Sequence, residues 1–235
     1  MHRAYHRWFS SALHRDMELL AFGHGGPPLL VFPTADGAFF EYEDRGMVAA
    51  LAPRIEGGQL RLFTLSTVNR ESWLAADVAP RRRVLRHLQY EDCLLTDVIP
   101  FVRQVTGAET VGATGCGFGG YHAMVLALRH PSLVTSCITM GATFDIAPLL
   151  DGYFDEDCYL LNPPSFLPGL TDAYYLDAYR RNTWVLATGE GEARPATEQF
   201  AWLMGTKGIG HALHVLTDAA NDWPGWAKMA GACLP

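Results

Sequence analysis

The chain has 235 residues, a length that suits one folded α/β domain, since such domains commonly reach about 250 residues. Hydrophobic residues make up 49% and charged residues 18%, which excludes a disordered or fibrous chain and predicts a protein that folds alone. With a net charge of −7, the chain has no basic surface field to attract nucleic acids or acidic lipids, so we expect neither as a partner.

Cysteine usage and the first residues bear on the compartment. The five cysteines are odd in number and widely spaced without a C-x-x-C pair, so neither a disulfide framework nor a zinc site is indicated: Cys93, Cys116, Cys137, Cys158 and Cys233. Residues 1–16 contain no apolar signal segment, and no run of about 18 apolar residues occurs. We therefore expect a cytoplasmic protein without a membrane anchor.

Strand and helix signals alternate along the chain. Seven short apolar segments predict strands: Met17–Phe22, Leu29–Pro33, Leu60–Leu65, Thr110–Thr114, Val134–Met140, Trp184–Thr188 and Leu213–Leu216. Helix-length segments lie between or after them, at about 43–52, 80–104, 119–129, 195–207 and 223–232. The alternation predicts one α/β domain over 1–235, with a doubly wound, mostly parallel sheet and helices on both faces.

The longest helical segment, 80–104, begins with Pro80 in the first turn, and we expect Pro100 to kink it. Its first turn carries Arg81, Arg82 and Arg83, which we interpret as a solvated face, with an anion site as the alternative.

Residues 143–181 interrupt the alternation. They are crowded with Tyr, Phe, Asp and Pro and include an Asn162-Pro-Pro run. We interpret them as an excursion between core strands that covers one sheet edge.

A glycine-rich turn, Gly115-Cys-Gly-Phe-Gly-Gly, follows the predicted strand that ends at Thr114. It matches the dinucleotide fingerprint G-x-G-x-x-G, but several strands precede it, and Met140-Gly141 stands where an acidic residue is expected at the end of the next strand. Asp145 comes late for that role. The fingerprint alone is weak evidence for a dinucleotide.

The same turn matches the nucleophile elbow G-x-S-x-G in frame, with Gly117 at the centre. Gly117 has no hydroxyl or thiol, and Cys116 stands one residue early, where a small buried side chain is expected. A tight strand–helix turn without chemistry remains open as an alternative.

Short stretches along nearly the whole chain carry a family resemblance. They are Tyr5-His-Arg-Trp-Phe-Ser, Asp16-Met-Glu-Leu-Leu-Ala-Phe-Gly-His-Gly-Gly, Val31-Phe-Pro-Thr, Glu41-Tyr-Glu-Asp, Tyr121-His-Ala, Leu128-Arg-His-Pro, Asn162-Pro, Leu167-Pro-Gly-Leu-Thr-Asp, Ala187-Thr-Gly-Glu and Asp222-Trp-Pro-Gly-Trp. Together they resemble the putative-esterase branch of the α/β-hydrolase superfamily, which contains esterase D-like and feruloyl-esterase-like proteins.

The resemblance implies a serine esterase from which two catalytic side chains have been lost. The family carries serine at the centre of the elbow and histidine in a G-H-D-W-P motif, where this chain has Gly117 and Asn221. The family carboxylate corresponds to Glu190 or Glu192, with Glu192 the closer match. Glycine offers no nucleophile and asparagine accepts no proton, so we expect no serine-esterase chemistry.

Backbone amides of the family's oxyanion hole would survive these losses. The candidates are the amide of Phe118 and one from the Thr34-Ala35-Asp36-Gly37 loop. Asp36 would repel an oxyanion if it points inward, and otherwise caps a turn. Six aromatics either wall a pocket over the elbow or pack under the excursion: Phe39, Phe40, Tyr153, Phe154, Tyr174 and Tyr175.

None of the other histidines is expected to replace the missing base. His24, His122, His211 and His214 are each interpreted as a hydrogen-bonded structural residue. The spacings His211-x-x-His214 and His2 to His6 suggest metal ligands, but no carboxylate or cysteine completes a set, so no metal and no cofactor are predicted.

These observations predict a non-hydrolytic pseudoenzyme that binds an unidentified small molecule or protein. The main alternative is an enzyme of retooled chemistry, in which Asp36, Glu190, Glu192 or a pocket histidine transfers protons. A pure interaction surface is a third hypothesis. A dinucleotide-binding protein is the last.

Overall fold

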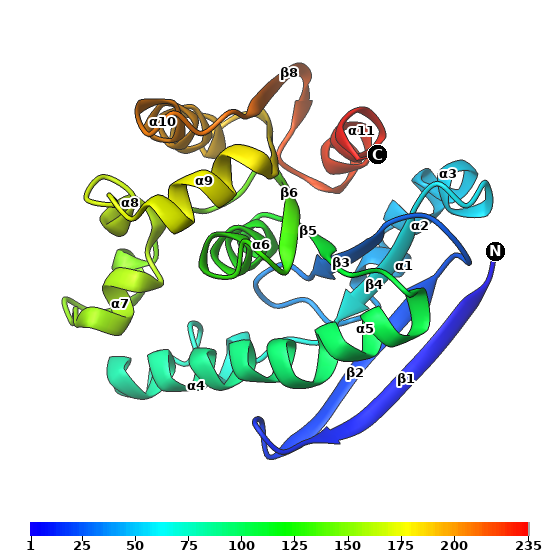
Figure 1. The fold of residues 1–235 in the computed structure, drawn as a ribbon, viewed down its shortest axis with the longest axis horizontal. Coiled ribbons are helices and arrows are strands. Elements are labelled where there is room, and N and C mark those ends of the chain that lie inside the picture. The colour runs from blue at the N-terminus through cyan, green and yellow to red at the C-terminus, as the bar shows by residue number, and fades with distance from the viewer. Residues whose placement is uncertain (235) are drawn as a thin grey trace.

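A computed structural model describes residues 1–234 as one eight-stranded sheet in the order β1-β2-β4-β3-β5-β6-β7-β8 (Figure 1). The strands are β1 (Arg3–Ser10), β2 (Arg15–Phe22), β3 (Pro28–Phe32), β4 (Arg61–Leu65), β5 (Val111–Cys116), β6 (Val134–Met140), β7 (Thr183–Glu190) and β8 (Ala212–Ala220). β1 and β2 pair antiparallel, β2 pairs antiparallel with β4, and the remaining pairs are parallel. The predicted mostly parallel sheet is confirmed.

Helices cover both faces of this sheet. They are α1 (Glu41–Asp44), α2 (Met47–Ala50), α3 (Ala52–Glu56), α4 (Pro80–Cys93), α5 (Ile99–Thr106), α6 (Phe118–Arg129), α7 (Glu156–Leu160), α8 (Pro163–Phe166), α9 (Ala173–Arg181), α10 (Ala193–Thr206) and α11 (Trp223–Cys233). One apolar core joins the sheet to α4, α5, α6, α9 and α10. A second core joins the opposite face to α1, α2, α3 and α11. The predicted two-sided arrangement is therefore present.

The sequence interpretation missed β1, which lies at one edge of the sheet. Its burial alternates along the strand, with Tyr5 and Phe9 exposed and Ala4 and Trp8 partly buried. Arginine and histidine between these residues obscure the period-two pattern, because an edge strand buries little surface.

The helix predicted over 80–104 forms as α4 and α5, which continue one into the other (Figure 1). The turn that joins them, η2 (Leu94–Val98), is π-helical and ends two residues before Pro100. A wider turn tolerates the missing proline N–H, so the disruption expected at Pro100 takes the form of a π turn.

The interpretation of the arginine run as a solvated face is wrong for Arg83, whereas Arg81 keeps 43% of its side chain exposed. Arg83 is 4% exposed and donates to the carbonyls of Val78 and Leu149 and to the carboxylate of Asp151. Arg81 pairs with Asp155. These arginines fasten the excursion to α4.

The excursion lies between β6 and β7 and contains η3 (Ala147–Leu149), α7, α8 and α9. Ile146, Leu150 and Leu161 pack against Phe118 and Tyr121 of α6 in a third apolar cluster. The segment thus covers helices α4 and α6, whereas β1 and β8 form the sheet edges. The prediction that it covers a sheet edge is corrected accordingly.

Within residues 1–234, no helix is both long enough and apolar enough to cross a membrane.

Candidate functional site

The turn between β5 and α6 has the strand–turn–helix form of an elbow, with Gly117 at its apex. Gly117 has φ 55° and ψ −119°, a backbone conformation that strains any residue with a side chain. Its amide donates to the carbonyl of Met140 at 3.0 Å, and its carbonyl accepts from the amides of Gly120 and Thr143 at 3.1 and 3.2 Å. The apex is therefore held on both sides of the peptide.

Two flanking glycines make this turn sterically possible. A methyl group on Gly119 would stand 2.6 Å from the carbonyl oxygen of Pro33, and one on Gly115 would stand 2.7 Å from the amide nitrogen of Gly120. Only glycine allows α6 to lie this close to the ends of β3 and β5. The spacing that suggested an elbow therefore has a packing cause.

The apex itself has room for a side chain. A methyl group on Gly117 would meet only Trp226 of α11, whose Cζ2 and Cη2 atoms would lie 3.8 and 3.9 Å away. Those are ordinary van der Waals distances. The indole Nε1 of Trp226 is buried and has no hydrogen-bond partner among the described residues.

Asn221 follows β8 at the same end of the sheet. Its side-chain oxygen accepts from the amide of Gly189 at 2.9 Å, and its Nδ2 donates to the carbonyls of Gly189 and Glu190, both at 3.3 Å. A methyl group on Gly141 would stand 2.9 Å from Asn221 Cγ and 3.0 Å from Trp226 Nε1. The end of β6 therefore lies against both side chains, and the Asn221 amide is bound to the end of β7.

The two candidate carboxylates lie apart from the Asn221 side chain. The Glu190 carboxylate pairs with Arg194 at 2.6 Å and is half exposed. Glu192 is exposed and immediately precedes α10, with no hydrogen bond or ion pair from its carboxylate in residues 1–234. Neither carboxylate orients the group at position 221.

The 34–37 loop binds the carboxylate of Glu41, the first residue of α1, a contact that the sequence did not indicate. The Thr34 amide and hydroxyl donate to Glu41 at 2.9 and 2.7 Å. The carboxylate lies so close to Gly37 that a methyl group there would stand 2.6 Å from Glu41 Cδ. Asp36 points away, 73% exposed, and pairs with Arg70 at 3.1 Å. The internal anion at this loop is Glu41 rather than Asp36.

A buried amide connects this loop to α6. Asn69 is fully buried; its Nδ2 donates to the carbonyl of Ala35 at 3.0 Å, and its Oδ1 lies 2.7 Å from Nε2 of His122. Burial, and secondarily the charge of His87, hold the pKa of His122 well below its usual range, so its ring is neutral. His122 is therefore a structural residue that helps to position the loop.

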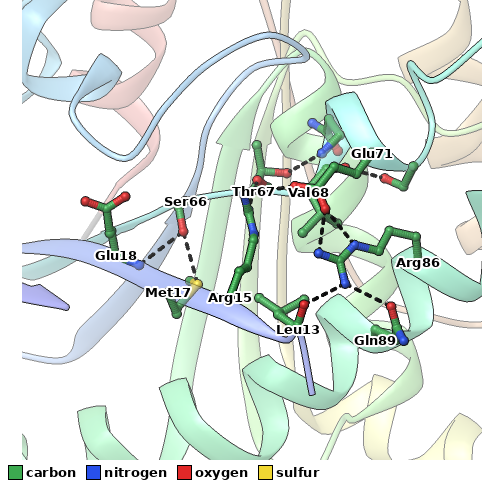
Figure 2. Close-up of polar contacts among 12 residues, drawn as sticks. Leu13, Arg15, Met17, Glu18, Ser66, Thr67, Val68, Glu71, Arg86 and Gln89 are labelled. Carbon is green, nitrogen blue, oxygen red and sulfur yellow. Dashed lines mark hydrogen bonds and ion pairs between the residues drawn. The ribbon is translucent and has the colours of Figure 1, made fainter. Parts of the chain in front are cut away.

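The segment that carries Asn69 is held from its other side by arginines (Figure 2). Arg15 donates to the carbonyl of Thr67 at 2.7 Å and pairs with Glu71 at 2.9 Å. Arg86 pairs with the same Glu71 and donates to the carbonyl of Leu13 at 2.9 Å. The β1–β2 hairpin, the segment after β4 and α4 thus support the loop beside the elbow.

Three backbone amides remain near the elbow as candidate donors. Phe118 is the first residue of α6, and its N–H has no acceptor within the helix. In the loop, the Thr34 amide donates to Glu41 and the Gly37 amide to the Thr34 carbonyl, which leaves the Ala35 and Asp36 amides. Beside them lies a hollow of about 470 Å³, lined by Asp36, Gly37, Ala38, Phe40, Glu41, Asp44, Arg45 and Arg70.

Cys116 contributes no nucleophile. It is 1% exposed and belongs to the core under α11. Burial, with a smaller effect from the charge of Glu41, raises the pKa of its thiol well above its usual range. The thiol is therefore protonated and inert.

The aromatic residues proposed to wall a pocket are dispersed. Phe39 contacts Phe40 and Tyr5 of β1, Tyr153 hydrogen-bonds Asp155, and Tyr174 contacts Tyr175 on α9. Phe154 is 47% exposed beside Tyr153. They do not converge on Gly117.

The remaining histidines do not approach the elbow in any recorded contact. His211 bonds the carbonyl of Ile209 at 3.0 Å, His24 lies beside Gly58, and His214 is exposed on β8. In the described part of the chain, no group of three or more His, Cys, Asp or Glu residues is arranged to hold a metal.

No protein-family model and no curated protein sequence matches this chain. Solved structures do. A ferulic acid esterase superimposes with a TM-score of 0.78 over 100% of this chain and 96% of its own, at 17% identity. S-formylglutathione hydrolases superimpose with a TM-score of 0.70 and 14% identity: the Staphylococcus aureus enzyme over 99% of this chain and 97% of its own, and the Agrobacterium tumefaciens enzyme over 97% and 91%.

The chain therefore has the α/β-hydrolase fold, and the structures that it resembles include a ferulic acid esterase and S-formylglutathione hydrolases. The α/β-hydrolase fold that the sequence resemblance predicts is confirmed.

Proposed function

We propose that this protein is a non-hydrolytic member of the esterase-like α/β-hydrolase fold, which holds a small molecule or a protein segment at the elbow without cleaving it. The observation that carries the proposal is Gly117, which keeps the strained elbow backbone and the open space of a nucleophile position but has no side chain. Acyl transfer needs an attacking atom at that position, and glycine supplies none.

The surroundings of Asn221 support the same conclusion. An amide cannot take a proton from a nucleophile, and both polar atoms of this one are hydrogen-bonded to the backbone of β7. The two side chains of the relay are therefore missing together, while the backbone that would present them persists.

The positions of the other titratable groups disfavour retooled acid–base catalysis. Asp36 pairs with Arg70, Glu190 pairs with Arg194, and His122 is buried against Asn69. A general base must reach its proton within hydrogen-bond distance, and none of these contacts lies at the apex. Binding is thus better supported than catalysis.

Covalent labelling tests the proposal. A fluorophosphonate reacts with a serine that an adjacent base activates, and the adduct is visible by intact-protein mass spectrometry. We expect no adduct on the native protein. Labelling that heat denaturation abolishes would contradict the proposal, because it would reveal an activated nucleophile elsewhere in the fold.

A reducing compartment remains our proposal for the location. All five cysteines are unpaired thiols, which supports it.

A further inference from the structure

A second cavity, of about 280 Å³, lies between the excursion and α10. Its nine lining residues include Phe144, Asp145, Ala196, Phe200 and Trp202. Its floor is the stacked pair Phe144 and Phe200, whose ring centroids lie 4.2 Å apart with planes 8° from parallel. We call it the α8–α10 cavity. Its apolar floor and small volume suit a molecule of about one ring.

One carboxylate stands at this cavity in a fixed position. Asp145 Oδ1 accepts from the amide of Ala147 and from Nδ2 of Asn162, both at 2.9 Å. Asn162 is itself 3% exposed and is fixed by Ser165 and the amide of Ile146. The second oxygen of Asp145, Oδ2, has no hydrogen bond or ion pair within residues 1–234. The carboxylate is therefore preorganised, with one acceptor free.

The lining carries one charge sign only. Asp145 is the single ionisable side chain among the nine residues; the nearest recorded cation, Lys207, donates from outside the lining to the carbonyl of Pro168 at 3.0 Å. Beside the cavity, Trp202 leaves 70% of its surface exposed, which is unusual for the largest apolar side chain. The face of an aromatic ring at a cavity rim attracts a cation, and the ring also packs against an apolar body.

We propose that the α8–α10 cavity binds a small organic cation, an ammonium joined to an aromatic or branched aliphatic body. The ammonium donates to Oδ2 of Asp145, and the body packs on Phe144 and Phe200 and against Trp202. A charge-assisted hydrogen bond gives the preference for a cation, and apolar burial gives the preference for the body. The proposal is independent of the elbow, since it uses no residue of that site.

Calorimetric titration with three probes that share a phenylethyl body tests the charge preference. The probes are 2-phenylethylammonium, 2-phenylethanol and 3-phenylpropanoate, which carry similar bodies with positive, neutral and negative ends. We expect the ammonium to bind about tenfold more tightly than the alcohol, and the carboxylate to give no measurable binding. Equal affinity for the ammonium and the alcohol would overturn the proposal.

One variant and a matched control locate the site. D145N keeps an acceptor for Asn162 and Ala147 but removes the charge, and E109Q removes one charge from an exposed glutamate elsewhere. We expect D145N to weaken the ammonium about tenfold and E109Q to leave its affinity unchanged. Equal effects of the two would mean that only net charge matters and would refute the site.

A cavity-filling variant, A196W, keeps the test decisive if D145N does not fold. Ala196 is exposed on α10 at the cavity, so a large ring there fills the space and leaves the Asp145 carboxylate in the chain. We expect A196W to abolish binding of both the ammonium and the alcohol. Unchanged ammonium affinity in folded A196W would place the cation elsewhere and refute the proposal.

Discussion

The carboxylate of Glu41 accepts hydrogen bonds from both the amide and the hydroxyl of Thr34, at 2.9 and 2.7 Å. The loop in which an esterase is expected to present amides to an oxyanion thus has a negative group of its own. Of the four loop amides, that of Thr34 is engaged by Glu41 and that of Gly37 by the Thr34 carbonyl. The relationship also fixes the loop, because Glu41 begins α1 and packs against Gly37.

Removing this carboxylate should destabilise the fold locally. We expect E41A to lower the free energy of unfolding by about 1–3 kcal/mol, since two charge-assisted hydrogen bonds are lost. D44A, which removes an exposed carboxylate of the same helix, serves as the control and should change stability by less than about 0.5 kcal/mol. Urea denaturation at neutral pH compares the two, and equal losses would show that Glu41 does not hold the loop.

Restoring serine alone should cost stability without giving activity. Gly117 has φ 55° with ψ −119°, so we expect G117S to lose about 1–3 kcal/mol through backbone strain. G107S is a matched control, because Gly107 has φ 73° and open space around it, and should lose about 1 kcal/mol. Denaturation midpoints measure both losses. Fluorophosphonate labelling of G117S would reveal an activated serine. It would show that position 221 is not where the catalytic base was lost.

Restoring both side chains should recover chemistry. If the Phe118 amide and a loop amide still face position 117, the double variant G117S/N221H should cleave a short aryl ester at least about tenfold faster than the native protein. Neither single variant should do so, because serine needs its base and histidine alone activates only water. Steady-state rates of the three variants, with folding checked by circular dichroism, decide the matter. A folded but inactive double variant would mean that the oxyanion site is lost.

Stability should fall as the pH is lowered from 7 to 5. Burial lowers the pKa of His87 to about 4, although the charge of Glu91 opposes this, and an unfolded histidine has a pKa of about 6.5. Between these values the unfolded chain holds a proton that the native chain lacks, so acid favours unfolding. His122 and His6, whose pKa values are also lowered by burial, add to the same trend.

The variant H87Q isolates one contribution. It should reduce the loss of unfolding free energy between pH 7 and pH 5 by about 2 kcal/mol, the amount expected for one histidine with these two pKa values. Urea titrations at several pH values provide the measurement. A pH profile parallel to that of the native protein would show that His87 does not titrate in this way.

The sequence was sufficient where local pattern decides the structure. Strands β2 to β8 are short apolar runs between breakers, and Gly117 and Asn221 lie within motifs whose neighbours are contiguous in the chain. The glycines of the elbow could also be predicted from the sequence, because the close packing of β5 against α6, which are adjacent in the chain, requires them.

Contacts between segments that are distant in the chain could not be predicted from the sequence. Asn69 bridges Ala35 and His122, and the two links span 34 and 53 residues. Arg83 is buried against the Leu149 carbonyl and the Asp151 carboxylate of the excursion, and no local pattern distinguishes this position from a solvated helix face. The pairing of Glu41 with Thr34 depends on how the chain turns between β3 and α1, which no local pattern in the sequence indicates.

The steady-state rate of short aryl ester hydrolysis by the native protein distinguishes a non-hydrolytic protein from a working esterase. Loss of a nucleophile or base lowers turnover on the order of 10⁶-fold in a serine hydrolase, with little further loss when both are absent. If the protein is non-hydrolytic, we expect a hydrolysis rate no more than a trace above that of buffer, unchanged by a fluorophosphonate. Turnover near that of an ordinary esterase, abolished by the fluorophosphonate, would contradict it.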